Sequence, residues 1–241
     1  MKNKQHLIRT GILLIFLSFL LHALHFVLFK DLKHVFVYLL GDIAFIPLEV
    51  FIVSLVIDQL LERREKQERF KKVNMLIGLF YQELGLRLLG AFTMADPHVD
   101  QLQKICHVTP NWQEADFRRA EQAIGQISYQ VSAYKVNLDE LQAMLAENKS
   151  LLINLIANPT LLEHETFSEL LLAVSHLQDE LQLRASARRA NPKYENLDHL
   201  QIDMERAYGH LMVQWLRYIE HLKSDYPFLF ATALVTNPLN R

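Results

Sequence analysis

Four residues near the N-terminus have chemistry that is unusual for the apolar stretches around them. Asp42 and Glu49 are seven residues apart, which places both carboxylates on nearly the same face of an α-helix. Pro47 lies between them and, inside a helix, leaves the carbonyl group of Ile43 without its amide donor. His22 lies in the preceding apolar stretch. At membrane depth, carboxylates and imidazoles can relay protons or replace the hydration shell of a cation.

These residues become neighbours if the two apolar stretches fold back on each other. In a symmetric hairpin, residues whose numbers sum to about 64 lie level, which pairs His22 with Asp42 and Ile15 with Glu49. Two roles then fit the set. It could form a path for protons or cations, or it could hold helices and protomers together at ~1 kcal/mol or less per contact. Either role keeps the acids away from lipid, where they are costly.

The stretches that carry these residues are long enough to cross a membrane. Residues 10–29 have no formal charge and, at ~1.5 Å per residue, suffice for a ~30 Å hydrocarbon layer. We expect a first span over about residues 8–29 and a second over residues 35–61, joined by a short polar turn. The apolar segment of the second span is longer than the hydrocarbon layer requires, so this helix would tilt or protrude from the layer. Residues 1–61 are therefore predicted to be an N-terminal transmembrane hairpin.

Basic residues predict the orientation of this hairpin, because short cytoplasmic segments are enriched in Lys and Arg. Both termini are expected to be cytoplasmic, at the cell (inner) membrane. A secretory signal peptide is the competing interpretation of the basic N-terminus, but the apolar run is too long and no small-residue cleavage pattern follows it. The bases are Lys2, Lys4 and Arg9 before span one, Lys30 and Lys33 in the turn, and Arg63, Arg64, Lys66, Arg69, Lys71 and Lys72 after span two.

The six bases after span two, referred to below as the collar, are mixed with three acids and no Pro or Gly. Pairs at i, i+3 and i, i+4 can therefore continue the helix through the headgroup region. The net positive charge suits anionic lipid headgroups, so membrane lipids are expected partners. Beyond the collar, apolar residues recur at every third or fourth position, as on a helix face buried against neighbours: Phe70, Val73, Ile77, Phe80, Leu84, Leu88 and Phe92. Ala95-Asp96-Pro97 predicts the end of this helix.

Residues 62–241 are predicted to be a cytoplasmic helical bundle with four to five long helices. The overall class is all-α, with the second span continuing into the bundle. Capping residues and proline breaks predict helices over Pro110 to about Tyr134, Leu138–Ala157, about residues 161 or 166 to 188, and about 196–224. A short helix between Pro97 and Val108 and a short apolar tail over residues 228–235 complete the prediction.

Composition excludes some classes of function. A formal charge of −2 over 241 residues gives no reason to expect nucleic acid as a partner. The single cysteine, Cys106, cannot form an internal disulfide, and we expect it to be a small buried residue.

The sequence lacks the common metal-binding motifs of helical proteins. No histidine has Glu three residues before it, which excludes the di-iron carboxylate pattern of bundles, and His-Glu-x-x-His is absent. His199 and Asp203 are one helical turn apart and could be metal ligands or interhelical hydrogen-bonding groups. The bases Arg184, Arg188, Arg189 and Lys193 suit a helix C-terminus or an anion site. No catalytic residue, metal or cofactor is predicted.

Several segments resemble those of a family of bacterial and archaeal hypothetical membrane proteins. They are Gly41 to Pro47, Asn158 to Glu165, Arg206 to Tyr208, and His221 to Pro227. The resemblance implies the two-span architecture and a prokaryotic origin, and it carries over no catalytic residue.

Two functions follow as expectations. The first is a non-enzymatic assembly, docking or sensing module anchored at the inner membrane, as a homo-oligomer and with a cytoplasmic protein partner. The alternative is a homo-oligomeric ion channel or proton/cation transporter that uses Asp42 and Glu49. A membrane-bound enzyme is the third class considered.

Overall fold

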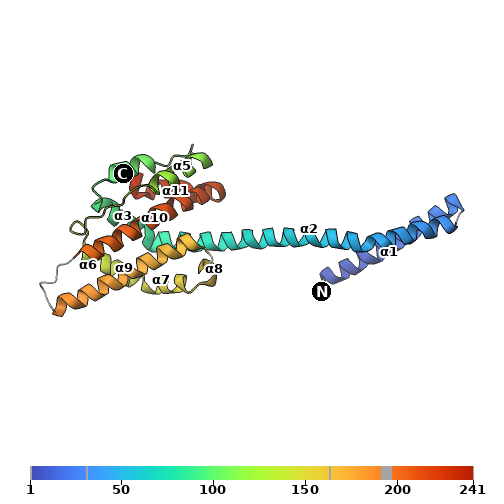
Figure 1. Cartoon of the computed structure of the whole chain (residues 1–241), viewed down its shortest axis with the longest axis horizontal. Coiled ribbons are helices and arrows are strands. Elements are labelled where there is room, and N and C mark those ends of the chain that lie inside the picture. The colour runs from blue at the N-terminus through green and yellow to red at the C-terminus, as the bar shows by residue number, and fades with distance from the viewer. Residues whose placement is uncertain (1, 31, 163, 191–196, 241) are drawn as a thin grey trace. The chain divides into compact units, whose positions relative to one another are not determined.

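The computed structural model describes residues 2–30, 32–162, 164–190 and 197–240. The described residues are almost entirely helical and contain no strand, so the all-α prediction is confirmed (Figure 1). The chain divides into two compact units, Met1–Lys66 and Gln67–Arg241. Helix α2, Leu32–Phe80, belongs to both, because it begins in the first unit and ends in the second.

The first unit consists of helix α1, Lys2–Phe29, and the first part of α2. Apolar side chains are exposed along both helices, among them Phe19 at 77% and Leu40 at 69%. The rings of His25 and Tyr38 join the two helices edge to face, with centroids 6.2 Å apart. The numbers of these two residues sum to 63, which agrees with the hairpin register predicted from the sequence.

The predicted helix beyond the collar ends where expected but is not uniform. Helix α2 passes into a π-helical turn, Tyr81–Gly85, and then into α3, Leu86–Ala95, which stops before Asp96. The wider π turn brings two consecutive aromatic residues, Phe80 and Tyr81, into the core. Six of the seven predicted core positions are buried. Phe70 is the exception at 53% exposed, because it precedes the turns that the other helices cover.

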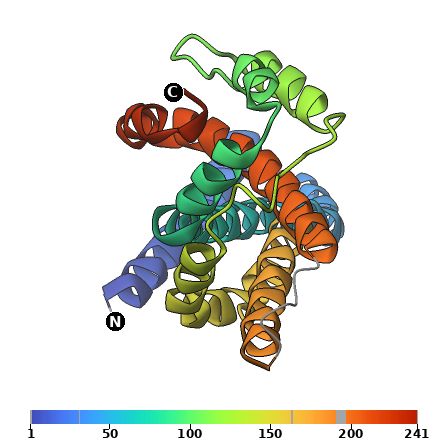
Figure 2. The ribbon, with the colours of Figure 1, turned by 90° about the vertical axis from the view of Figure 1, so that its left-hand side faces the viewer.

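The remaining helices pack around this segment. Helices α9 and α10 make the most extensive contact of the second unit. Figure 2 shows α5 in light green and the α6 and α7 pair in olive at opposite sides of this unit, with α3 and α10 between them. The bounds are α4 Val99–Ile105, α5 Glu114–Ile124, α6 Leu138–Glu147, α7 Lys149–Ile156, α8 Pro159–Leu162, α9 Glu165–Ala190, α10 Asp198–Asp225, α11 Pro227–Thr236 and a 3-10 turn Pro238–Asn240.

Two predicted helices are wrong in their bounds. The helix expected from Pro110 to about Tyr134 is only α5, because the backbone N–H of Trp112 donates to the Thr109 carbonyl in a turn, 3.1 Å. Helix α5 starts instead at a cap in which the Gln113 N–H donates to the Asp116 carboxylate, 2.7 Å. The helix expected over Leu138–Ala157 divides at Asn148, whose side chain donates to the Met144 carbonyl.

Other expectations hold. Asn137 caps α6 by accepting from the Glu140 N–H, 3.2 Å. The apolar residues that recur at helical spacing along α9 and α10 are buried, and Cys106 is 2% exposed. Burial raises the pKa of the Cys106 thiol to about 12, so the thiol is protonated at neutral pH. The apolar tail expected at residues 228–235 is helical and forms most of α11.

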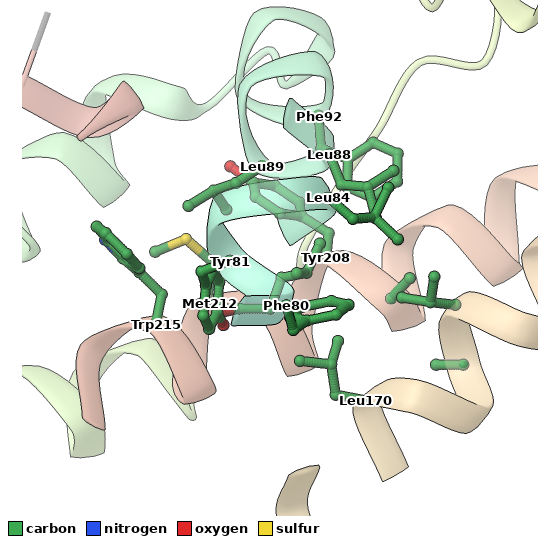
Figure 3. Close-up of a cluster of buried hydrophobic side chains, with 14 of the residues drawn as sticks. Phe80, Tyr81, Leu84, Leu88, Leu89, Phe92, Leu170, Tyr208, Met212 and Trp215 are labelled. Carbon is green, nitrogen blue, oxygen red and sulfur yellow. The ribbon is translucent and has the colours of Figure 1, made fainter. Parts of the chain in front are cut away.

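The centre of the core joins the end of α2 to α10 (Figure 3). The Tyr81 ring stacks on Tyr218 with centroids 5.5 Å apart, and its hydroxyl donates to the Leu211 carbonyl, 2.8 Å. Phe80 packs edge to face on Phe167 of α9, with centroids 5.6 Å apart. Aromatic pairs of this kind contribute ~0.5–1.5 kcal/mol beyond the area that they bury. These contacts link α9 and α10 to the point where α2 passes into the π-helical turn.

Gly85 and Gly90 provide a matched test of this packing. A Cβ at Gly85 would lie 2.6 Å from Tyr81 Cδ1 and 2.8 Å from Phe80 Cε1. A Cβ at Gly90 would have no described side chain within 4 Å, apart from its chain neighbours. We expect Gly85→Ala to lower the free energy of unfolding by ~1–3 kcal/mol. Gly90→Ala should raise it by ~0.5–1 kcal/mol through helix propensity. Circular dichroism of the full chain in detergent during denaturant unfolding measures both, and equal stabilities would contradict the packing described here.

Candidate functional site

A pocket of about 720 Å³ lies within the second unit. Its walls come from α2, α5 and the turn before it, α10, and His164 just before α9. The volume falls in the range of small-molecule sites, which is ~300–1,000 Å³.

Helix α10 provides one wall. Gln214, Arg217, His221 and Ser224 are spaced by three, four and three residues, so they form one row along the helix beside its apolar face. Gln214 is only 2% exposed. The polar row therefore begins at a deeply buried amide and ends at the exposed Ser224.

A hydrogen-bonded network fixes the inner end of this row. The Thr166 hydroxyl donates to Gln214 Oε1, 3.3 Å, and accepts from Arg217 Nη1, 3.0 Å. His164 Nδ1 accepts from the Phe167 N–H, 3.4 Å, which makes Nε2 the protonated nitrogen of the neutral ring. Burial, and then the charge of Arg217, lower the pKa of His164. The ring is therefore a neutral N–H donor at pH 7.

The Glu220 carboxylate is poorly compensated. Burial is the largest cause that raises its pKa, and repulsion from Glu114 and Glu121 raises the pKa further. Two arginines lower the pKa by less. Those arginines are engaged elsewhere, because Arg217 Nε donates to Glu121 at 2.7 Å and Arg118 pairs with Glu114 at 3.3 Å. Within the described part of the chain, Glu220 has no hydrogen bond or ion pair.

Aromatic residues form the opposite wall. Trp112 meets Phe117 edge to face with ring centroids 5.1 Å apart, and both line the pocket together with Phe70. The ammonium group of Lys223 donates to the Trp112 carbonyl. His221 lies 3.4 Å from Asp225, but burial outweighs that carboxylate and lowers the pKa of the imidazole. The pocket thus combines hydrogen-bond donors, a free carboxylate and an apolar surface.

The residues singled out within the apolar stretches lie elsewhere, in the first unit. His22 Nδ1 donates to the Ser18 carbonyl of its own helix, 2.9 Å. Asp42 and Glu49 are exposed on α2, and α2 continues through Pro47. No hydrogen bond or ion pair joins His22 to Asp42 in the part of the chain that the structure describes. The structure does not connect the four residues, and their role as a path or as a contact between helices stays a prediction.

The collar residues are all exposed on α2: Arg63, Arg64, Lys66, Arg69, Lys71 and Lys72. Their exposure leaves a dense row of positive charge along the helix surface. Whether lipid headgroups bind there stays a prediction.

The second histidine pair belongs to an ion network between α9 and α10. His199 Nδ1 lies 3.2 Å from the buried Asp203 carboxylate and 3.7 Å from Glu180. Glu180 also accepts from Arg184, 2.7 Å. This places His199 and Asp203 among interhelical contacts, one of the two roles considered for them. Among the described residues, no cluster of His, Cys, Asp and Glu is suited to hold a metal ion. Lys193 and the side chains of Arg188 and Arg189 lie outside the described residues.

Sequence reasoning missed the pocket because its residues come from distant segments. The polar row of α10 was the available signal, since Gln214, Arg217 and His221 recur at helical spacing next to a predicted apolar face. The partners Trp112 and His164 lie more than 40 residues from that row in the chain, and no local pattern indicates that they meet it.

Comparison with known proteins places the chain in a family. Residues 69–235 match the description "Uncharacterized protein MJ1433, C-terminal helical domain", and residues 2–61 match "MJ1433, N-terminal helical domain". The chain belongs to the MJ1433 family. It is 37% identical over 240 residues to Uncharacterized protein MJ1433 of Methanocaldococcus jannaschii, and the match covers 100% of this chain and 96% of that relative. No solved structure matches.

The sequence segments predicted a family of bacterial and archaeal hypothetical membrane proteins. The MJ1433 match confirms an uncharacterised family with an archaeal member, and the membrane location stays a prediction. All the pocket residues fall within residues 69–235, the range of the MJ1433 C-terminal helical domain.

Glu220 gives a pH-dependent prediction. Its folded-state pKa is raised above the ordinary value of 4.5, so its ionisation opposes folding as pH rises through the window above 4.5. We expect Glu220→Gln to be more stable than the unaltered protein at pH 7 and equally stable near pH ~4. Denaturant unfolding at the two pH values measures the difference.

Glu147→Gln is the control for this prediction, because Glu147 is 68% exposed and only loosely paired with Arg87 at 3.7 Å. Its effect should stay within ~0.5 kcal/mol at both pH values. A loss of stability in Glu220→Gln at pH 7 would show that Glu220 has a favourable partner, contrary to the description above.

Proposed function

We propose that this protein is an integral membrane protein in which α1 and the apolar part of α2 anchor a cytoplasmic helical module. The module has a docking or sensing role, and the pocket of the second unit is its ligand site. The anchor, its orientation and the module's role are inferences from the surfaces described above.

One observation carries the anchor. The segments Arg9–Leu28 and the one that begins at Phe36 are apolar and long enough to span a bilayer, and neither is buried within the chain. Exposed apolar patches larger than a few hundred Å² are uncommon on soluble monomers and mark membrane or protein contacts. The length, composition and exposure of both helices are those required in lipid.

The pocket supports a ligand-binding role for the module. Arg217 is held by Glu121 and Thr166, and the pKa of the His164 imidazole is lowered, so the ring stays neutral. Groups fixed in this way by their neighbours serve to orient a ligand. A cytoplasmic protein and a second copy of the chain are further partners that this proposal includes.

Single cysteines test the anchor and its orientation. Lys33→Cys places a thiol in the predicted outer turn and Ser128→Cys places one on the exposed surface of the second unit. The natural Cys106 adds little background, because it is buried and protonated. A membrane-impermeant maleimide should label Lys33→Cys in intact cells and Ser128→Cys only after permeabilisation. The reverse pattern, or labelling of both only after lysis, would contradict the proposal.

An ion channel or proton/cation transporter is the second candidate. Asp42 and Glu49 are exposed in the apolar part of α2 and, among described residues, have no hydrogen bond or ion pair. Uncompensated acids in lipid must be protonated, meet another copy of the chain or line water. Two helices cannot enclose a path, so this function requires a homo-oligomer.

The double variant Asp42→Asn, Glu49→Gln separates the two candidates. If the acids line a path, the mass of the complex in nanodiscs should stay unchanged and ion flux in reconstituted vesicles should be lost. If the acids hold protomers together, the variant should dissociate. A wild-type monomer or an absence of flux in the wild type would eliminate the channel and leave the anchored module.

A further inference from the structure

We propose that the pocket of the second unit binds a small zwitterion, a molecule that carries a primary ammonium group and an oxyanion a few atoms apart, with a short apolar body. This inference deepens the docking or sensing role proposed above and rests on it only for its biological use. Binding in the pocket does not require the anchor to be inserted.

The oxyanion end is assigned to the inner part of the pocket, where donors converge. Gln214 is 98% buried, since its exposed fraction is 2%, and its Oε1 already accepts from Thr166. Its amide nitrogen has no partner among the described residues, although the side chain lines the pocket. This nitrogen keeps access to solvent in the pocket, where a ligand oxygen can replace water as its acceptor.

Two further donors flank that amide. His164 lines the same pocket as a neutral ring whose Nε2 carries the proton, because Nδ1 accepts from the backbone N–H of Phe167. Arg217 lies on the same row of α10 as Gln214, one turn away, and contacts the same Thr166 hydroxyl. Gln214 Oε1, His164 Nδ1 and Arg217 Nη1 all lie within hydrogen-bond distance of the Thr166 hydroxyl. This leaves the Gln214 amide nitrogen and the His164 Nε2–H as donors for a carboxylate or a phosphate beside the Arg217 charge.

The ammonium end is assigned to the outer part, near Glu220. This carboxylate lines the pocket and has no ion pair in the described chain, whereas the neighbouring Glu114 and Glu121 each have an arginine. Trp112 lines the opposite wall of the same pocket, and the face of an indole ring also attracts an ammonium group. A ligand cation would supply the counter-charge that Glu220 lacks.

The charged residues at the two ends of the pocket argue against a ligand that carries only positive or only negative charge. A simple anion would meet Glu220 and Glu114, and a simple cation would meet Arg217 and Lys223. Only a molecule with both charges compensates the two ends together. Phe117 and Trp112 leave an apolar surface for the body of the ligand.

Two sources offer this chemistry, a free amino acid and an ethanolamine phospholipid headgroup. The lipid headgroup is within reach as a source because Phe70, which lines the pocket, follows the predicted second span by only nine residues. The experiment must therefore separate the two sources.

Isothermal titration of the full chain in dodecyl maltoside provides the test. The probes are leucine, 4-methylpentanoate, which lacks the amine, and isoamylamine, which lacks the carboxylate. O-phosphoethanolamine is compared in the same way with phosphate and ethanolamine. At least one zwitterion should bind about tenfold more tightly than either analogue that lacks one of its charged groups. Each such analogue lacks one set of charge-assisted hydrogen bonds. Competition by short-chain phosphatidylethanolamine, but not by phosphatidylglycerol, would assign the lipid source, and no competition by either would assign a free zwitterion.

Variants locate the binding in the pocket. Glu220→Gln should remove the preference for the zwitterion over the amine-free analogue, while Glu147→Gln, a matched change on an exposed side chain, should keep it. The inference is overturned if neither zwitterion binds better than the analogues that lack one of its charged groups, or if the two variants behave alike. Either failure leaves the cysteine labelling of the anchor unaffected, so the two proposals are tested separately.

Discussion

The structure depends on a single helix, α2, whose two parts have different surroundings. Between Phe36 and Leu61 its apolar side chains are exposed, whereas from Val73 onward one face of the same helix is buried, with Phe80 against Phe167 of α9. The Tyr81 hydroxyl and ring fix that second part to α10. Lipid would cover the first part, and packed helices cover the second. The charged collar between them marks the change of surroundings.

The pocket is built from groups that the fold does not need. The core of the second unit is apolar and aromatic, while the pocket retains a buried amide at Gln214 and an uncompensated carboxylate at Glu220. Such groups lower stability unless something binds to them, and proteins often accept that cost at functional sites. Ligand binding is assigned to the pocket rather than to the ion network of Asp203, because Glu220 has no ion pair in the described chain, whereas the Asp203 carboxylate lies 3.6 Å from Arg206 and 3.2 Å from His199, although its Oδ2 accepts no hydrogen bond.

Helical periodicity and capping were sufficient to predict much of the fold. The buried face from Val73 to Phe92 and the cap at Asn137 follow from local patterns that tertiary contacts reinforce. The break at Asn148 was missed, because a side-chain hydrogen bond within the helix competes with the backbone pattern. The π turn at Tyr81 was also missed, since it is favoured by rings from other helices. The pocket depends on contacts between distant segments and left only a polar row on α10 as a signal.

The most direct test of the central claim, that α1 and the apolar part of α2 lie in lipid, is alkaline carbonate extraction of membranes from cells that express the full chain. Carbonate strips proteins that are held at the surface by charge or by protein contacts, and it leaves those with helices in the hydrocarbon core. The account predicts that the chain stays in the membrane pellet and is released only by detergent. Release of the chain into the carbonate supernatant would contradict it and would mean that other protein surfaces cover the two apolar helices.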